Sequence, residues 1–127
     1  MKDAVKLGLV LAAGIAIGAI GVPALKAQPA AHAAYVVAEL HVTDPAGFTQ
    51  YVKALPATLA PYHAKTLARG LPDTREGTPP DGDVVILGFD SLKAANEWYQ
   101  SAAYQAIVPL RQKSATSRVY LVDGAAR

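Results

Sequence analysis

The chain of 127 residues contains no cysteine, one methionine, one tryptophan and two phenylalanines. Without cysteine it can form no disulfide, no thiolate metal site, no thiolate nucleophile and no lipoprotein anchor. The absence fits an oxidising compartment but does not place the chain in one.

Several catalytic motifs are also missing from the sequence. It contains no G-x-S-x-G, no phosphate-binding glycine loop and no H-E-x-x-H. Its three histidines supply few metal ligands. These absences argue against hydrolase, nucleotide-dependent and zinc-protease chemistry, and we expect neither a metal site nor a cofactor.

The N-terminus has the order of a secretory signal peptide. Lys2 and Lys6 form a short positive region, residues 7–25 carry no polar side chain, and small residues follow. This order predicts a signal peptide over 1–27 that is cleaved after Ala27. Export would place the rest of the chain in the periplasm or cell envelope, with secretion as a further option.

Two alternatives remain open for this segment. Cleavage after Ala33 would follow an Ala-x-Ala tripeptide. The 19 apolar residues of 7–25 could also act as an uncleaved membrane anchor, although many are Gly or Ala, which contribute little to insertion. Contact with a membrane is expected only through this leader. The remaining organisation is a linker over 28–33, one domain over 34–124 and a tail over 125–127.

The formal net charge of +2 comes from the leader. Removing residues 1–27 takes away three of the 12 basic and one of the 10 acidic residues, which leaves nine of each. A neutral domain without a run of Lys or Arg offers little attraction to a phosphate backbone. We therefore expect no nucleic-acid partner.

Four segments have the alternating or apolar patterns of β-strands. The first strand has one wholly apolar face and one mixed face, which contains Glu39 and His41. A loop rich in proline and glycine, with a little strand near 74–76, separates the second strand from the third. The strands are expected at 35–42, 64–70, 84–89 and 117–122.

Two regions have helical patterns. In the first, Asp44 is the expected N-cap, and Pro56 and Pro61 are expected to kink or segment the helix. In the second, Ser91 is the expected cap, and a further helical piece begins at Ser101. We expect Pro109 to interrupt that last piece, because proline lacks the N–H that a helix interior uses.

The resulting order, β-α-β-β-α-β, predicts an α+β protein with a ferredoxin-like fold. Right-handed crossovers give a four-stranded antiparallel sheet in the order 4-1-3-2, with both helices on one face. The other face would have no cover, which is costly for a domain of this size. A homodimer in which two open faces meet, a dimeric α+β barrel, would cover it.

Five short segments are the most specific features of the domain sequence: 67–70, 98–99, 104–107, 109–111 and 117–118. On these segments the sequence over 34–124 resembles the bacterial domain-of-unknown-function family 1330, a member of the dimeric α+β barrel superfamily. The resemblance implies that fold and a dimer. The family has no established catalytic residue, and its superfamily includes cofactor-independent monooxygenases, haem-degrading enzymes, isomerases and ligand binders, so no reaction is implied.

Polar residues of two neighbouring strands are the main site candidates. Antiparallel pairing of the first and last strands is expected to bring Arg118 to Glu39, with His41 beside them. Arg69, on the edge strand, is a further candidate whose facing the sequence leaves open. This group is either an intersubunit salt-bridge cluster or a ligand site.

Two aromatic residues are secondary candidates. The helical spacing of Trp98 and Tyr99 favours a place in the core, although either could line a cleft. The sequence as a whole predicts an exported dimer that binds a small organic molecule. A cofactor-independent monooxygenase or isomerase and a purely structural module are the alternatives, so whether the protein is an enzyme is left open.

Overall fold

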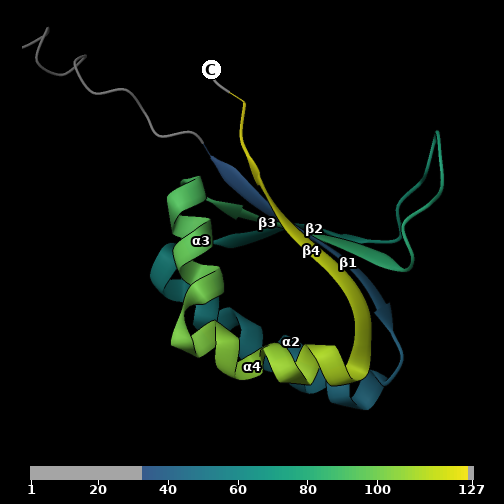
Figure 1. Cartoon of the computed structure of the whole chain (residues 1–127), viewed down its shortest axis with the longest axis horizontal. Coiled ribbons are helices and arrows are strands. Elements are labelled where there is room, and N and C mark those ends of the chain that lie inside the picture. The colour runs from purple at the N-terminus through teal and green to yellow at the C-terminus, as the bar shows by residue number, and fades with distance from the viewer. Residues whose placement is uncertain (1–32, 126–127) are drawn as a thin grey trace, which may run out of the picture. The chain divides into compact units, whose positions relative to one another are not determined.

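The computed structural model describes residues 33–125, so the predicted leader and the end of the tail lie outside the described residues. The described part forms one unit with the predicted order of elements (Figure 1). The second predicted helical region is a pair of helices. The elements are β1 Ala34–Val42, α2 Pro45–Leu59, a 3-10 turn Ala60–Tyr62, β2 Lys65–Gly70, β3 Asp83–Phe89, α3 Leu92–Gln100, α4 Ala102–Ser114 and β4 Ala115–Asp123.

The four strands form one antiparallel sheet in the order β2-β3-β1-β4. This is the predicted order, read from the opposite edge. Figure 1 shows α2, α3 and α4 gathered on one side of the sheet, while the long loop between β2 and β3 extends away from them. The α+β, ferredoxin-like fold predicted from the sequence is confirmed.

The helix starts follow the capping residues that the sequence indicates. The side chains of Asp44, Ser91 and Ser101 each accept a hydrogen bond from the backbone N–H three residues on, at 3.3, 3.1 and 3.2 Å. Each satisfies one of the backbone donors that a helix leaves free at its N-terminus. Ser101 ends α3 and begins α4, which explains how two helices follow each other without a linker.

The expected interruption at Pro109 is wrong. Helix α4 continues through this residue to Ser114, and α2 likewise continues past Pro56. Each proline removes only one helical hydrogen bond, and buried residues on both sides of it, Val108 and Arg111 in α4, hold the helix in place. Only Pro61 coincides with a change, from α-helix to 3-10 turn.

The β2–β3 loop also differs from expectation. The short strand expected near 74–76 is not formed, because this segment has no pairing partner in the sheet. The loop ends at Gly82, whose φ of 90° is unfavourable for other residues.

The hydrophobic core lies between the sheet and the helices. Trp98 is 1% exposed, its ring centroid is 4.0 Å from that of Tyr104, and its indole N–H donates to the Thr58 hydroxyl at 3.1 Å. The predicted core position of Trp98 is confirmed. The buried cluster comprises Val36, Leu40, Tyr51, Leu55, Leu59, Val85, Leu87, Phe89, Ala95, Trp98, Tyr104 and Val108.

The opposite face of the sheet, which we call the open face, carries no helix from residues 33–125 (Figure 1). Tyr120 and Val122 of β4 are each 44% exposed there, and Leu67 of β2 is 56% exposed. None of the helices within residues 33–125 combines the length and apolar character needed to cross a bilayer.

Candidate functional site

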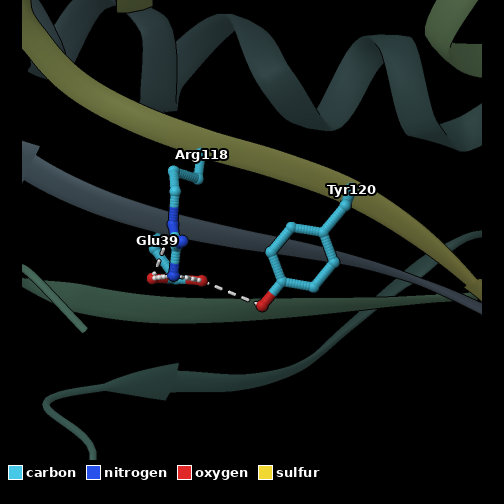
Figure 2. Close-up of polar contacts among 3 residues, drawn as sticks. All are labelled: Glu39, Arg118 and Tyr120. Carbon is cyan, nitrogen blue, oxygen red and sulfur yellow. Dashed lines mark hydrogen bonds and ion pairs between the residues drawn. The ribbon is translucent and has the colours of Figure 1, made fainter. Parts of the chain in front are cut away.

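A polar cluster on the open face contains Glu39 and Arg118, two of the site residues predicted from the sequence. Glu39 on β1 lies directly opposite Arg118 on β4. The guanidinium donates to both carboxylate oxygens, at 2.7 and 3.0 Å, and the hydroxyl of Tyr120 donates to one of them at 2.9 Å. Figure 2 shows both β4 side chains reaching across to the same carboxylate.

Glu39 is almost covered in this cluster although it lies on the open face. Its side chain is 7% exposed, whereas that of Arg118 is 75% exposed. Hydrogen bonds from Arg118, and secondarily from Tyr120, hold the pKa of Glu39 below its usual value. The carboxylate in turn raises the pKa of the Tyr120 hydroxyl. The carboxylate is therefore ionised and already bonded, which leaves it little capacity for a ligand.

The sequence predicts that His41 lies beside the Glu39–Arg118 pair, but in the structure His41 is paired with a different residue. Its ring lies 3.1 Å from the carboxylate of Asp81 in the β2–β3 loop, and both side chains are largely exposed. The sequence could not indicate this partner, because the conformation of a proline-rich loop is not set by strand register. Within residues 33–125, no three acidic or histidine side chains converge as a metal site would require.

A mainly apolar cavity of the described domain lies on the other side of the sheet. It has a volume of about 250 Å³ and is lined by side chains from the helix-facing side of the strands and from all three helices. The lining is mainly apolar and aromatic: Val36 and Ala38 of β1, Phe48 of α2, Val85 of β3 and Trp98 of α3 are typical members. Such a lining is typical of small-molecule sites.

Two tyrosines supply polar hydroxyl groups in this otherwise mainly apolar lining. The hydroxyls of Tyr51 and Tyr104 are buried and hydrogen-bonded to each other at 3.0 Å. Burial, followed by the neighbouring Tyr104, raises the pKa of Tyr51 well above its usual range. Tyr51 therefore stays neutral at physiological pH. Because one hydroxyl hydrogen occupies the shared bond, the pair retains one further O–H donor.

Arg111 lies close to this tyrosine pair. It is 5% exposed and donates to Ser117, and its charge offsets part of the rise in the pKa of Tyr51. Its Nε has no hydrogen-bond partner among the residues that the structure describes. Burying a guanidinium without a paired carboxylate costs free energy of folding. Arg111 therefore makes the region beside the tyrosine pair polar, although most of the cavity wall is apolar.

Arg69 also lines the cavity, and it is therefore separated by the sheet from Arg118. In β2 the register shifts between Thr66 and Ala68, so that Arg69 pairs with Val85. Val85 faces the helices and is buried, and neighbours across a sheet share a face. The sequence left the facing of Arg69 open, and the structure places it with the cavity and away from the cluster of Glu39.

The charged residues of the lining are Arg69 and Asp83. Both side chains belong to exposed residues, whereas most of the lining is buried, so they mark the side where the cavity meets solvent. Trp98 borders the cavity, and its neighbour Tyr99 does not. Sequence reasoning missed Tyr51, Tyr104 and Asp83 as site residues, because their patterns are those of core and strand-end positions.

The sequence of the described domain matches a known protein family. The model of the family described as Domain of unknown function (DUF1330) matches residues 33–125. The chain belongs to the DUF1330 family. No curated protein matches this DUF1330 chain.

Solved structures share the fold of this DUF1330 protein at low sequence identity. A protein of unknown function from Rhodopseudomonas palustris has 16% identity and a TM-score of 0.59, covering 76% of this chain and 85% of that chain. SnoaB, a cofactor-independent oxygenase from Streptomyces nogalater, has 19% identity and a TM-score of 0.55, covering 76% and 95%. A dimeric ferredoxin-like protein from Thermobifida fusca has 14% identity and a TM-score of 0.53, covering 77% and 96%. At these identities the likeness is one of fold.

Proposed function

We propose that this DUF1330 protein binds a small, largely apolar organic molecule in the cavity between the sheet and the helices. The supporting observation is the cavity itself, about 250 Å³ enclosed mainly by apolar and aromatic side chains. Water occupies about 30 Å³ per molecule in the liquid, so the space corresponds to roughly eight waters. Few groups in the lining could hold so much water by hydrogen bonds, which favours an organic occupant.

A screen of small organic molecules by thermal shift tests this proposal, with Ala38→Leu as the blocking variant. Ala38 is partly buried in the cavity wall, so the larger side chain would fill the space. Filling a cavity commonly stabilises a protein by ~0.5–2 kcal/mol, so the variant should melt at or above the wild-type temperature while losing every ligand response. Ala103→Leu, at an exposed position of α4, is the matched control and should keep them.

A second candidate is a cofactor-independent oxygenase, the activity of the similarly folded SnoaB. The observation that favours it is the buried, hydrogen-bonded pair of hydroxyls at Tyr51 and Tyr104, since a fixed O–H donor in an apolar cavity stabilises a developing oxyanion. Oxygen uptake with any ligand found in the screen separates the two candidates. Uptake that is lost in Tyr104→Phe would support the enzyme, and binding without uptake would leave a binding protein.

We also propose that two copies associate through their open faces. The face exposes Tyr120, Val122 and Leu67, and a protein of the same fold from Thermobifida fusca is described as dimeric. Light scattering should give twice the chain mass, and Val122→Asp should give a monomer. Leu71→Asp, at a residue 79% exposed in the β2–β3 loop, is the matched control and should remain dimeric.

Export remains a proposal that rests on the leader. The order of positive, apolar and small residues over 1–27 supports it. Mass spectrometry of the protein recovered from the cell envelope should find an N-terminus at Gln28 or Ala34. An intact Met1 in the membrane fraction would show an anchor, and intact protein in the cytosol would refute export.

A further inference from the structure

We propose that the ligand of the cavity carries a single carboxylate, held by Arg69 where the cavity meets solvent. This inference rests on the proposed function and specifies its ligand as a small amphipathic monocarboxylate. The chain itself supplies three observations for it: the direction in which Arg69 points, the lack of a partner for its charge, and the two hollows that it borders.

The direction of Arg69 is set by an irregularity of the edge strand. Thr66 is opposite Leu87, and after a regular step Ala68 would be opposite Val85 and Arg69 would point to the open face. The extra residue, Leu67, shifts the register so that Arg69 takes the position opposite Val85. A β-bulge of this kind turns the side chains that follow it to the other face.

The bulge also has its own accommodation on the open face. Gly88 of β3 lies beneath Leu67, and a Cβ there would be 2.8 Å from Cδ1 of Leu67. A side chain at this position would therefore displace Leu67. The extra residue Leu67 occupies the space that a side chain at position 88 would fill. The bulge is therefore an accommodated part of the β2–β3 pairing and not fraying at the end of a strand.

The charge of Arg69 has no partner within residues 33–125. The four ion pairs of this part of the chain involve other side chains, and no side-chain hydrogen bond from Arg69 is formed. It is also the one cation in the cavity lining. A guanidinium presents a planar fork of donors that fits a carboxylate in two parallel hydrogen bonds.

Arg69 borders a second hollow as well as the cavity. An open groove of about 460 Å³ lies along α2 and shares Val52, Leu55 and Arg69 with the cavity lining. Arg69 therefore lies between a partly enclosed apolar space and an open one. A ligand bound with its carboxylate on Arg69 would keep its charge close to water while its apolar part fills the cavity.

Asp83 limits the charge that the ligand can carry. It lies on the same face of β3 as Val85, two residues away, and Val85 is the partner of Arg69. One carboxylate can pair with Arg69, but a second would meet the negative charge of Asp83. The site is therefore expected to prefer monocarboxylates to dicarboxylates, and Asp83→Asn should tighten binding of a monocarboxylate several-fold.

Octanoate is a suitable probe because it has ten non-hydrogen atoms, close to the roughly eight waters that the cavity would hold. Isothermal titration of the protein recovered after expression of the full chain compares octanoate with 1-octanol and with octanedioate. We expect octanoate to bind about tenfold more tightly than 1-octanol, because hydrogen bonds between ionised partners are the strong ones. It should also bind more tightly than octanedioate, because the second carboxylate of octanedioate would lie in the apolar cavity or near Asp83. The affinity of octanoate should also fall as salt is added.

Variants assign the effect to Arg69. Arg69→Gln should weaken octanoate about tenfold, remove its salt dependence and leave 1-octanol unchanged, whereas Arg75→Gln, in the exposed β2–β3 loop, should change neither ligand. Equal binding of octanoate and 1-octanol to the wild type, or an Arg69→Gln variant with unaltered octanoate affinity, would overturn the inference and leave the cavity proposal intact. If neither these probes nor any molecule of the screen binds, the proposed function fails as well.

Discussion

Arg118 covers the carboxylate of Glu39 across the β1–β4 pair, and its guanidinium donates to both oxygens of that group. The pair accounts for a buried acidic side chain on the open face, which no helix of the described residues covers. Tyr120, two residues along the same strand, completes the coverage from the other side (Figure 2). The three side chains form a preorganised polar centre on the face through which we propose the dimer forms.

Acid should weaken the fold through Glu39. Its pKa is lower in the folded chain than its usual 4.5, so its contribution to stability is present above that pH and is lost as the pH falls through the folded value. Thermal melts between neutral pH and pH 3 should show a steeper loss for the wild type than for Glu39→Gln. Equal slopes would mean that the ion pair does not contribute to stability.

Alkali should act through Tyr120 in the opposite sense. The pKa of its hydroxyl is raised above 10, because it donates to Glu39, so its contribution is present below pH 10 and is lost as the pH rises through the folded value. Tyr120→Phe should melt lower than the wild type at neutral pH and lose less stability above pH 10. Spectrophotometric titration of the tyrosines, wild type against Tyr120→Phe, measures the shift directly.

The hydrogen bond between Trp98 and Thr58 should be measurable in the core. Thr58→Val keeps the shape of the side chain but leaves the buried indole N–H without its acceptor, which costs about 1–3 kcal/mol. Urea unfolding should show this loss. Thr78→Val, in the exposed β2–β3 loop, is the matched control and should change the free energy of unfolding by less than about 0.5 kcal/mol. A similar result for both variants would show that the bond contributes nothing.

Gly82 should not tolerate a side chain. Its φ of 90° is unfavourable for alanine, and a Cβ would collide with the backbone carbonyl of Leu40. Gly82→Ala should therefore cost about 1–3 kcal/mol or more in chemical unfolding. Gly77, in the same loop, also has a positive φ, but a Cβ there meets open space, so Gly77→Ala should cost clearly less. Equal costs would show that the contact with Leu40 is relieved by movement of the loop.

The architecture could be predicted because it depends on local patterns and general topological rules. Alternation placed the strands, Asp44, Ser91 and Ser101 placed the helix starts, and right-handed crossovers then left few possible sheet orders. The meeting of Glu39 and Arg118 followed from the same argument, since antiparallel pairing and side-chain parity fix which residues face each other.

The remaining features of the candidate site depend on information that such patterns do not contain. The pairing of Tyr51 with Tyr104 needs the mutual position of α2 and α4, and a tyrosine on an apolar helix face has the pattern of an ordinary core residue. The partner of His41 depends on a loop conformation. The face on which Arg69 lies depends on one unpaired residue in β2. The strand is so short that its hydrophobic pattern does not reveal this shift of register.

Because of the extra residue in β2, the face of the sheet on which Arg69 lies depends on the number of residues in that strand. Loss of a single codon at Leu67 would restore regular pairing and carry the arginine from the cavity side of the sheet to the open face. The same guanidinium would then leave the proposed ligand site and join the proposed dimer face, with no substitution anywhere. Relatives of this chain aligned column by column can thus carry an arginine in the same column and use it on opposite faces. The face that such an arginine occupies can be assigned only when β2 is counted from its pairing with Val85.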